Sequence, residues 1–125
     1  MTNLTREVWG REFDLEIVFE DLDGTGVDER QWSALGHIIT EWNAIDDSAS
    51  SLKEYCRKQN SSASDPGLFE NVFRYVIPKY LFVPRDQSRR IVALMCDYRF
   101  DPEHGLALVF ENEKLKEIGP QDIIL

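Results

Sequence analysis

Residues 90–110 read RIVALMCDYRF, DPEHG, LALVF, two apolar runs separated by a turn. Both runs are apolar at odd and at even positions, so if they are strands neither face is left to water. Asp101 and Pro102 favour a turn, and Gly105 accepts the positive φ with which the return strand begins. We expect this hairpin to be the buried strand pair of the core, on which the rest of the chain packs.

The residues before the hairpin predict a strand and two helices. Acidic and apolar side chains alternate over residues 12–19, which is typical of a half-buried strand with an acidic outer face. Apolar residues at three- and four-residue spacing then predict an amphipathic helix from Glu29 to about Ala44, with Asp28 as its N-cap and Trp32 in its buried stripe. A shorter helix is expected from Ala49 to about Lys58.

The remaining segments predict a loop, a third helix and further strands. Residues 58–67 are small and polar and contain Pro-Gly, the composition of a mobile loop. A short helix is expected from Leu68 until Pro78 ends it. Residues 79–83 and 115–118 predict short strands, the second at a sheet edge. The apolar terminus, residues 123–125, should dock in the core.

Length and composition indicate one soluble domain over residues 1–125. A chain of 125 residues can bury about two thirds of its unfolded surface without disulfides or metals. No segment approaches the length of a membrane span, and the first seven residues lack the apolar core of a secretion signal. We therefore expect a cytoplasmic α+β domain: an antiparallel sheet of about five strands with two or three helices packed on one face.

The net charge of −9 is concentrated in one part of the chain. Eight acidic residues and no Lys or Arg lie between Glu12 and Glu29. Such a field repels nucleic acid and attracts basic surfaces, although an acidic stretch also serves solubility alone. The carboxylates that we expect to bind a partner are Glu12, Asp14, Glu16, Glu20, Asp21, Asp23 and Asp28.

No cofactor or metal is expected. Residues 21–26 imitate the first half of an EF-hand loop, but Asp28 stands where an aliphatic residue belongs and Trp32 where the bidentate Glu belongs. Cys56 and Cys96 lie in segments that predict a helix and a buried strand, without metal-binding spacing. We interpret both as reduced thiols that act as small hydrophobic residues.

Two C-terminal segments carry a resemblance to a known group of proteins. Residues 103–106 read Glu-His-Gly-Leu, and residues 119–123 read Gly-Pro-Gln-Asp-Ile. With this pair the chain resembles small bacterial immunity proteins, encoded beside contact-dependent or other polymorphic toxins. The resemblance implies a noncatalytic protein that binds and silences a cognate toxin, often a nuclease that cuts transfer RNA with a basic active site. It implies no catalytic residues.

The first functional hypothesis is therefore an acidic immunity protein, monomeric in a 1:1 complex, that occludes a basic toxin domain. An alternative is a small hydrolase or metal-dependent enzyme that uses Glu103 and His104, although no recognised catalytic motif accompanies them. A third alternative is nucleic-acid binding through Arg85, Arg89 and Arg90, which the net charge disfavours. These arginines could instead pair with the acidic stretch.

Overall fold

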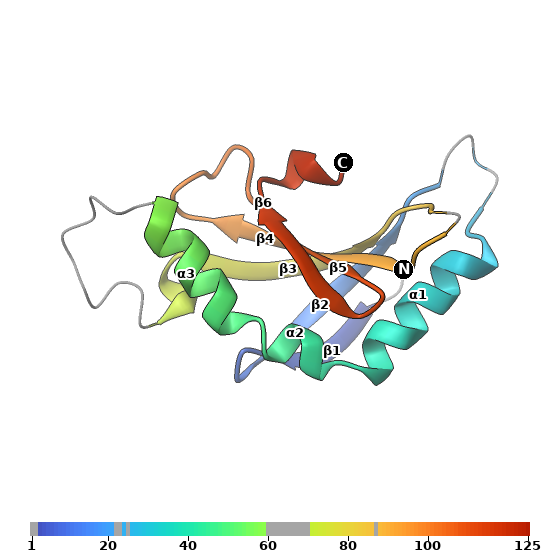
Figure 1. Ribbon diagram of the computed structural model, residues 1–125, viewed down its shortest axis with the longest axis horizontal. Coiled ribbons are helices and arrows are strands. Elements are labelled where there is room, and N and C mark those ends of the chain that lie inside the picture. The colour runs from blue at the N-terminus through green and yellow to red at the C-terminus, as the bar shows by residue number, and fades with distance from the viewer. Residues whose placement is uncertain (1–2, 22–23, 25, 60–70, 87) are drawn as a thin grey trace.

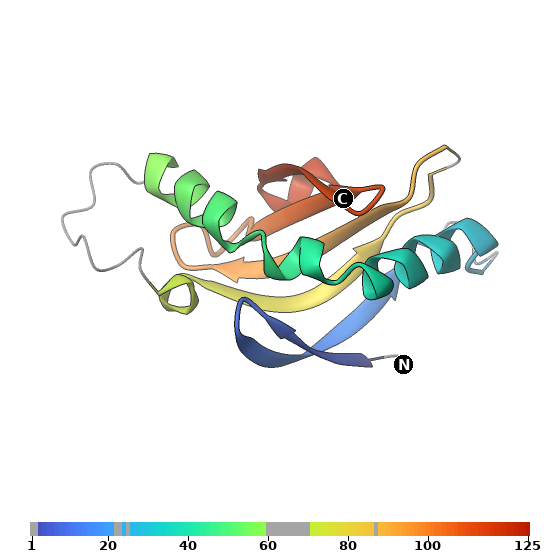
Figure 2. The same ribbon diagram turned by 60° about the horizontal axis from the view of Figure 1, so that its bottom comes forward.

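The computed structural model describes residues 3–21, 24, 26–59, 71–86 and 88–125. It consists of a six-stranded sheet with helices along one face (Figures 1 and 2). The strands occur in the sheet in their chain order: β1 (Asn3–Val8), β2 (Arg11–Phe19), β3 (Val76–Val83), β4 (Ile91–Tyr98), β5 (Leu106–Glu111) and β6 (Lys114–Gly119).

The predicted α+β class is confirmed, but the sheet is mixed and has one strand more than predicted. All neighbouring pairs are antiparallel except β2 and β3, which run parallel. Parallel neighbours need a crossover connection, and here the helices lie between the two strands in the chain. The additional strand is β1, which pairs with β2 over its whole length.

The β4–β5 hairpin lies inside the sheet, between β3 and β6, and is buried on both faces, as predicted. Leu94 and Cys96 belong to the core cluster under the helices, whereas Ala93 and Met95 belong to a second cluster on the opposite face. Gly105 has a φ of 64°, which confirms the expected left-handed residue before the return strand. The hairpin therefore separates two apolar layers.

The helical layer consists of α1 (Glu29–Thr40), α2 (Asn43–Asp46) and α3 (Ala49–Gln59), which follow one another across one face of the sheet (Figure 2). Asp28 caps α1 as predicted, and Gln31 completes a capping box. The buried Gln31 amide also donates to the carbonyl oxygens of Glu20 (2.8 Å) and Val83 (3.0 Å). One side chain thus joins the start of α1 to the ends of β2 and β3.

Two helix predictions are wrong in part. Trp32 is 52% exposed, so it does not belong to the buried stripe of α1. It packs its ring against Phe19 at a centroid distance of 4.7 Å and lies at the margin of the helix–sheet contact. The first predicted helix also ends earlier, at Thr40, and α2 follows as a separate single turn.

The third predicted helix, from Leu68 to Pro78, is replaced by a 3-10 turn and a strand. The turn η2 covers Val72–Arg74, and β3 already begins at Val76. Pro78 lies within β3 beside a register shift, a place where a strand tolerates a missing N–H. Residues 60–70, which include most of the predicted mobile loop, lie outside the described residues.

The C-terminus docks only in part. The 3-10 turn η3 (Gln121–Ile123) follows β6, and Figures 1 and 2 place it on the side of the sheet opposite the helices. Ile124 packs against the second apolar cluster. Leu125, which we expected to be buried, is 67% exposed. Within the described residues, no helix is long and apolar enough to cross a membrane.

Candidate functional site

Successive side chains of β2 point to opposite faces of the sheet. Leu15 and Ile17 are buried under the helices. Glu12, Asp14 and Glu16 therefore point to the opposite face, where all three are exposed. The prediction of a strand with an acidic outer face is confirmed.

Strand β1 adds a fourth carboxylate that sequence reasoning missed. Its register places Glu7 directly opposite Glu12, on the same face of the sheet. Residues 3–8 alternate weakly in polarity, so only the strand pairing reveals this neighbour. We call Glu7, Glu12, Asp14 and Glu16 the acidic strand face.

The acidic strand face has few compensating charges. Asp14 accepts hydrogen bonds from the Asn3 amide (3.2 Å) and the Thr5 hydroxyl (3.4 Å). Among the described residues, none of its four carboxylates forms an ion pair. Glu7 and Glu12 face each other with like charge, an arrangement that destabilises a sheet.

An apolar strip borders the acidic strand face. Tyr80 of β3 lies opposite Glu16 in the register, and Val18 lies opposite Phe82. Tyr80 and Val18 are half-buried and pack against the second apolar cluster. Burial, with a further contribution from the Glu16 carboxylate, raises the pKa of Tyr80. The neutral phenol is therefore favoured beside the carboxylates.

The predicted acidic surface is not continuous, because the loop carboxylates have partners within the chain. Asp21 accepts a hydrogen bond from the Gly26 N–H (2.9 Å), and Glu20 accepts one from the Arg85 N–H (2.8 Å). Asp28 caps α1 and lies 4.0 Å from the Arg85 guanidinium. These carboxylates shape the loop, whereas the strand carboxylates face outward. Asp23 lies outside the described residues.

The three arginines considered for nucleic-acid binding form ion pairs within the chain. Arg85 also donates to the carbonyl oxygen of Gly26. Arg89 pairs with Asp86 at 2.8 Å, and its guanidinium holds the pKa of that carboxyl well below its usual range. Arg90 forms a bidentate pair with Glu113. The alternative that they pair with the acidic stretch is confirmed for Arg85 alone, because the partners of Arg89 and Arg90 lie outside that stretch.

His104 and Glu103 lie in the exposed turn before β5. The backbone N–H of His104 donates to Asp101 Oδ1 (3.2 Å), and its ring Nδ1 lies 3.0 Å from the same oxygen. This hydrogen bond raises the pKa of His104. A cleft beside the turn is lined by Pro102 and Asp97 but not by Glu103 or His104. The geometry gives His104 a turn-stabilising role.

The two C-terminal motifs contact each other. The backbone N–H of Gln121 donates to the His104 carbonyl (3.1 Å), and its side-chain amide donates to the Cys96 carbonyl (3.1 Å). A Cβ atom at Gly105 would lie 2.6 Å from that amide nitrogen. The two motifs thus pack against each other and fix η3 to the β4–β5 turn.

One family model covers nearly the whole chain. The model of a family described as a domain of unknown function (DUF6985) matches residues 2–125. The chain belongs to this family. No curated protein and no solved structure matches this DUF6985 domain.

The two cysteines of the DUF6985 domain lie in its buried core. Cys56 and Cys96 are both buried in the core under the helices, where they act as small hydrophobic residues as predicted. Burial raises the pKa of the Cys56 thiol to about 11 and that of Cys96 well above its ordinary value. Within the described residues, no three His, Cys, Asp or Glu side chains come together as a metal site.

Proposed function

We propose that this DUF6985 domain is an immunity protein that binds a cognate bacterial toxin domain and neutralises it. The proposed toxin is a nuclease that acts on RNA, transfer RNA above all, and the acidic strand face is proposed to occlude its basic active site. The protein acts in the cytoplasm as a monomer in a 1:1 complex. It needs no cofactor and carries out no reaction of its own.

The observation that supports this proposal best is the position of the acidic strand face. Its carboxylates point away from the helical layer, and two of them, Glu7 and Glu12, repel each other across the β1–β2 pair. Proteins tolerate such a cost where a ligand removes it. A basic partner would replace the repulsion with attraction.

The chemistry of a nuclease active site fits this surface. Lys and Arg side chains that bind phosphates also bind carboxylates, so carboxylates spaced along a strand can imitate a nucleic-acid backbone. Complementary charge speeds association, and rim charges change mainly the association rate and its salt dependence. Tyr80, beside Glu16, has the amphipathic side chain that interface centres favour.

A charge-reversal experiment tests the proposal. The toxin would be the product of the reading frame next to the gene for this chain, and its nuclease activity would be measured with each inhibitor variant. The test variant carries Glu12→Lys, Asp14→Lys and Glu16→Lys. The control carries Glu41→Lys, Asp47→Lys and Glu54→Lys, three exposed positions of the helical layer, on the other side of the sheet, that change the net charge equally.

We expect the test variant to lose neutralisation and to associate more slowly, with a weaker dependence on salt. The control should keep most of its inhibition, because its changes lie outside the interface. Equal inhibition by both variants would reject the acidic strand face as the docking surface. A neighbouring gene product that neither binds the wild-type chain nor harms a cell lacking it would reject the immunity function itself.

A further inference from the structure

Strands β1 and β6 form the two edges of the sheet, and they are protected to different degrees. Strand β6 carries Lys114 and Lys116 and has an irregular register with β5, two features that hinder pairing with another strand. Strand β1 contains no Lys or Pro, and its register with β2 is continuous over residues 3–8. It lies at the margin of the sheet (Figure 2), and most of its residues are exposed. The β1 edge is therefore the one that is open to a further strand.

The backbone groups of alternate β1 residues point away from β2. The turn between the two strands has two residues, both with positive φ, so the pair that closes it, Val8 and Arg11, exchanges hydrogen bonds. Hydrogen-bonded and non-hydrogen-bonded pairs alternate along an antiparallel ladder. The N–H and C=O groups of Asn3, Thr5 and Glu7 therefore face outward from the sheet.

Side-chain contacts support this direction. The Glu7 carbonyl accepts a hydrogen bond from Trp42 Nε1 at 2.7 Å, and the Thr5 carbonyl accepts one from the Arg6 guanidinium at 3.0 Å. Trp42 thus closes the end of the edge next to the turn, whereas the Arg6 side chain is exposed and can move aside. Within the described part of the chain, no hydrogen bond uses the N–H groups of Asn3 and Thr5. These two residues form the accessible part of the edge.

The side chains beside this edge select the charge of an added strand. Thr5 lies opposite Asp14 and Glu7 lies opposite Glu12, so a strand added outside β1 would border the acidic strand face. Long side chains reach diagonal neighbours about 7–8 Å away across a sheet, so Lys or Arg at alternate positions would meet these carboxylates. On the other face of β1, Leu4 is half-buried, which favours uncharged residues between the basic ones.

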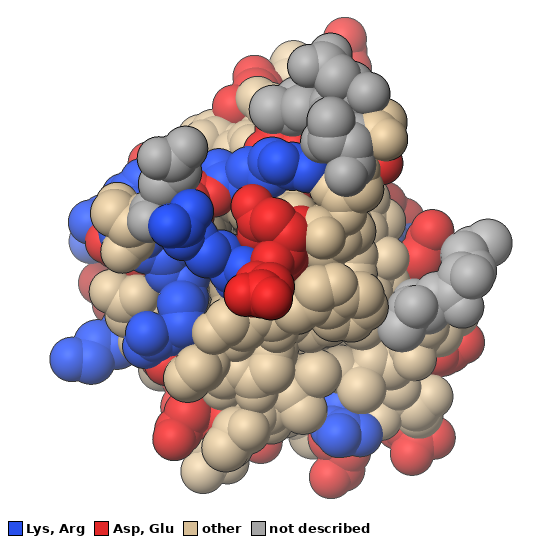
Figure 3. Space-filling view, turned by 90° about the vertical axis from the view of Figure 1, so that its right-hand side faces the viewer, with Lys and Arg blue, Asp and Glu red and all other residues tan. Residues whose placement is uncertain are grey.

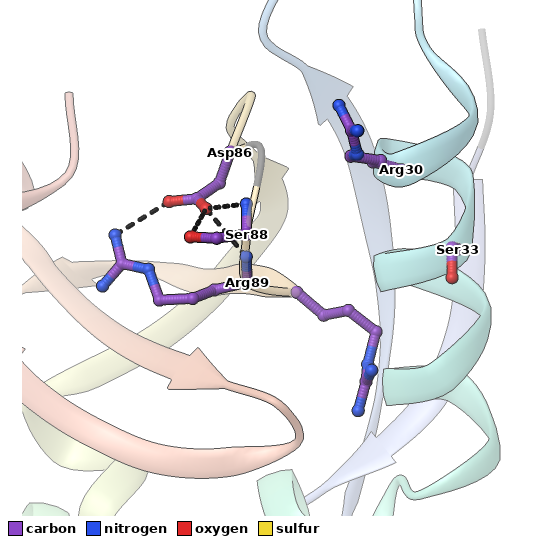
Figure 4. A pocket seen from close by; sticks show the side chains of 6 residues that line it. Arg30, Ser33, Asp86, Ser88 and Arg89 are labelled. Carbon is purple, nitrogen blue, oxygen red and sulfur yellow. Dashed lines mark hydrogen bonds and ion pairs between the residues drawn. The ribbon is translucent and has the colours of Figure 1, made fainter.

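The cations of the chain do not neutralise the acidic strand face. Figure 3 looks onto the end of the molecule where α1 begins and shows Lys and Arg gathered on one side of it. In the β3–β4 loop at this end, Arg89 already pairs with Asp86 (Figure 4). Arg11 is closer, but its guanidinium lies over the Phe73 ring, 4.3 Å from the centroid. The counter-charge for this face must therefore come from a partner.

We propose that the β1 edge binds an extended segment of the partner as an additional strand, with Lys or Arg at alternate positions of that segment. Backbone hydrogen bonds supply affinity in this binding mode, and alternate side chains supply specificity. The inference rests on the proposed function for the identity of the partner, whereas the binding mode is testable with peptides alone. A second copy of the chain is a poorer occupant, because pairing of two β1 edges would join two acidic strand faces in one sheet.

Titration with synthetic peptides tests the edge. The probe is a blocked peptide of about eight residues, within the usual length of a strand, in which Lys alternates with Thr. One control peptide has Glu in place of each Lys, and the other has N-methyl groups on two adjacent central amides, which blocks both of its edges. Amide hydrogen exchange of the full chain is followed by NMR.

We expect the Lys peptide to slow exchange of the Asn3 and Thr5 amides several-fold and saturably. The amides of Leu4 and Arg6 should change little, because they are already bonded to β2. The Glu peptide should not bind, because its charges repel the acidic strand face. The N-methylated peptide should lose the effect although it carries the same charge.

Two variants of Thr5 give a matched comparison. Thr5→Pro removes an outward N–H, and an edge strand tolerates Pro where that group faces solvent, so binding of the Lys peptide should weaken about tenfold. Thr5→Val loses the same hydroxyl, which donates to Asp14 at 3.4 Å, but keeps the N–H and should bind as the wild type does. The native spectrum shows whether each variant is folded, and if Thr5→Pro is unfolded the peptide comparison decides.

Equal binding of the N-methylated peptide, or no protection of Asn3 and Thr5 by the Lys peptide, would overturn strand addition. Protection of these amides that rises with protein concentration in the absence of peptide would assign the edge to a second copy instead. The immunity function is judged separately. A neighbouring gene product that is neutralised without protection of Asn3 and Thr5 would remove strand addition only, whereas peptide binding without toxin binding would keep the edge and reject the toxin.

Discussion

The side-chain amide of Gln121 occupies the space that a Cβ atom on residue 105 would need. A Cβ at Gly105 would lie 2.6 Å from Gln121 Nε2 and 2.9 Å from the Cys96 carbonyl oxygen. Gly105 also has a φ of 64°, a backbone angle that residues other than glycine and asparagine rarely adopt. The glycine therefore lets the C-terminal segment approach the end of β4.

Gly105→Ala should destabilise the protein by about 2–4 kcal/mol, from the left-handed backbone and the steric overlap together. Gly10→Ala is the matched control, because Gly10 has a φ of 88° but no atom within 4 Å of its Cβ position. It should cost only about 1 kcal/mol. Urea unfolding of both variants measures the difference. Adding Gln121→Ala to Gly105→Ala should recover part of the loss, and equal costs at the two glycines would contradict the steric argument.

Glu12→Gln should increase stability. The substitution removes the like-charge repulsion with Glu7, so we expect a gain of a few tenths of a kcal/mol at low ionic strength that shrinks as salt is added. Glu54→Gln is the opposite control, because Glu54 pairs with Lys58 across one turn of α3 at 3.3 Å, and its loss should slightly destabilise the protein. A destabilised Glu12→Gln variant in low salt would show that Glu12 has a favourable partner.

The Asp101–His104 contact predicts a pH dependence. The Asp101 carboxylate raises the pKa of His104 in the folded protein, so the charged pair stabilises the fold fully below the unfolded pKa of His. That contribution disappears as the pH rises through the raised folded pKa. NMR titration should show a lower His104 pKa in Asp101→Asn, and a smaller decrease in Glu103→Gln, whose charge contributes less. The penalty of His104→Gln should accordingly be larger at about pH 5.5 than at about pH 9. A His104 pKa unchanged by Asp101→Asn would refute the contact.

Trp32 and Leu35 test which residues form the contact of α1 with the sheet. Leu35 is 5% exposed, so Leu35→Ala should cost about 2–5 kcal/mol. Trp32 is 52% exposed and keeps mainly its contact with Phe19, so Trp32→Ala should cost only about 1 kcal/mol. Thermal or urea unfolding compares the two variants. A greater loss of stability from Trp32→Ala than from Leu35→Ala would contradict the exposed position of Trp32 and favour the buried position that the helical spacing predicts.

The sequence was most informative where a short-range pattern had one physical solution. Continuous apolar runs around a Pro- and Gly-containing turn required a strand pair buried on both faces, and the alternation over residues 12–19 required an acidic outer face. Asp28 could cap a helix because the cap depends only on the next few residues. Each of these features depends on neighbours within a few positions.

Longer-range features needed the tertiary structure. The parallel β2–β3 pair depends on where the crossover returns the chain, which no local pattern encodes. For the same reason the predicted carboxylates divided into two groups: Asp28 and Glu20 meet Arg85 only because α1 and β3 bring their loops together.

The amino-acid order alone determined that the β4–β5 hairpin is buried on both faces and which face of β2 is charged, because side chains alternate along any strand. The tertiary structure alone decided which charges remain available to a ligand. Ion pairing depends on distances of a few ångströms between groups that lie far apart in the chain, and packing of the helices and loops sets those distances.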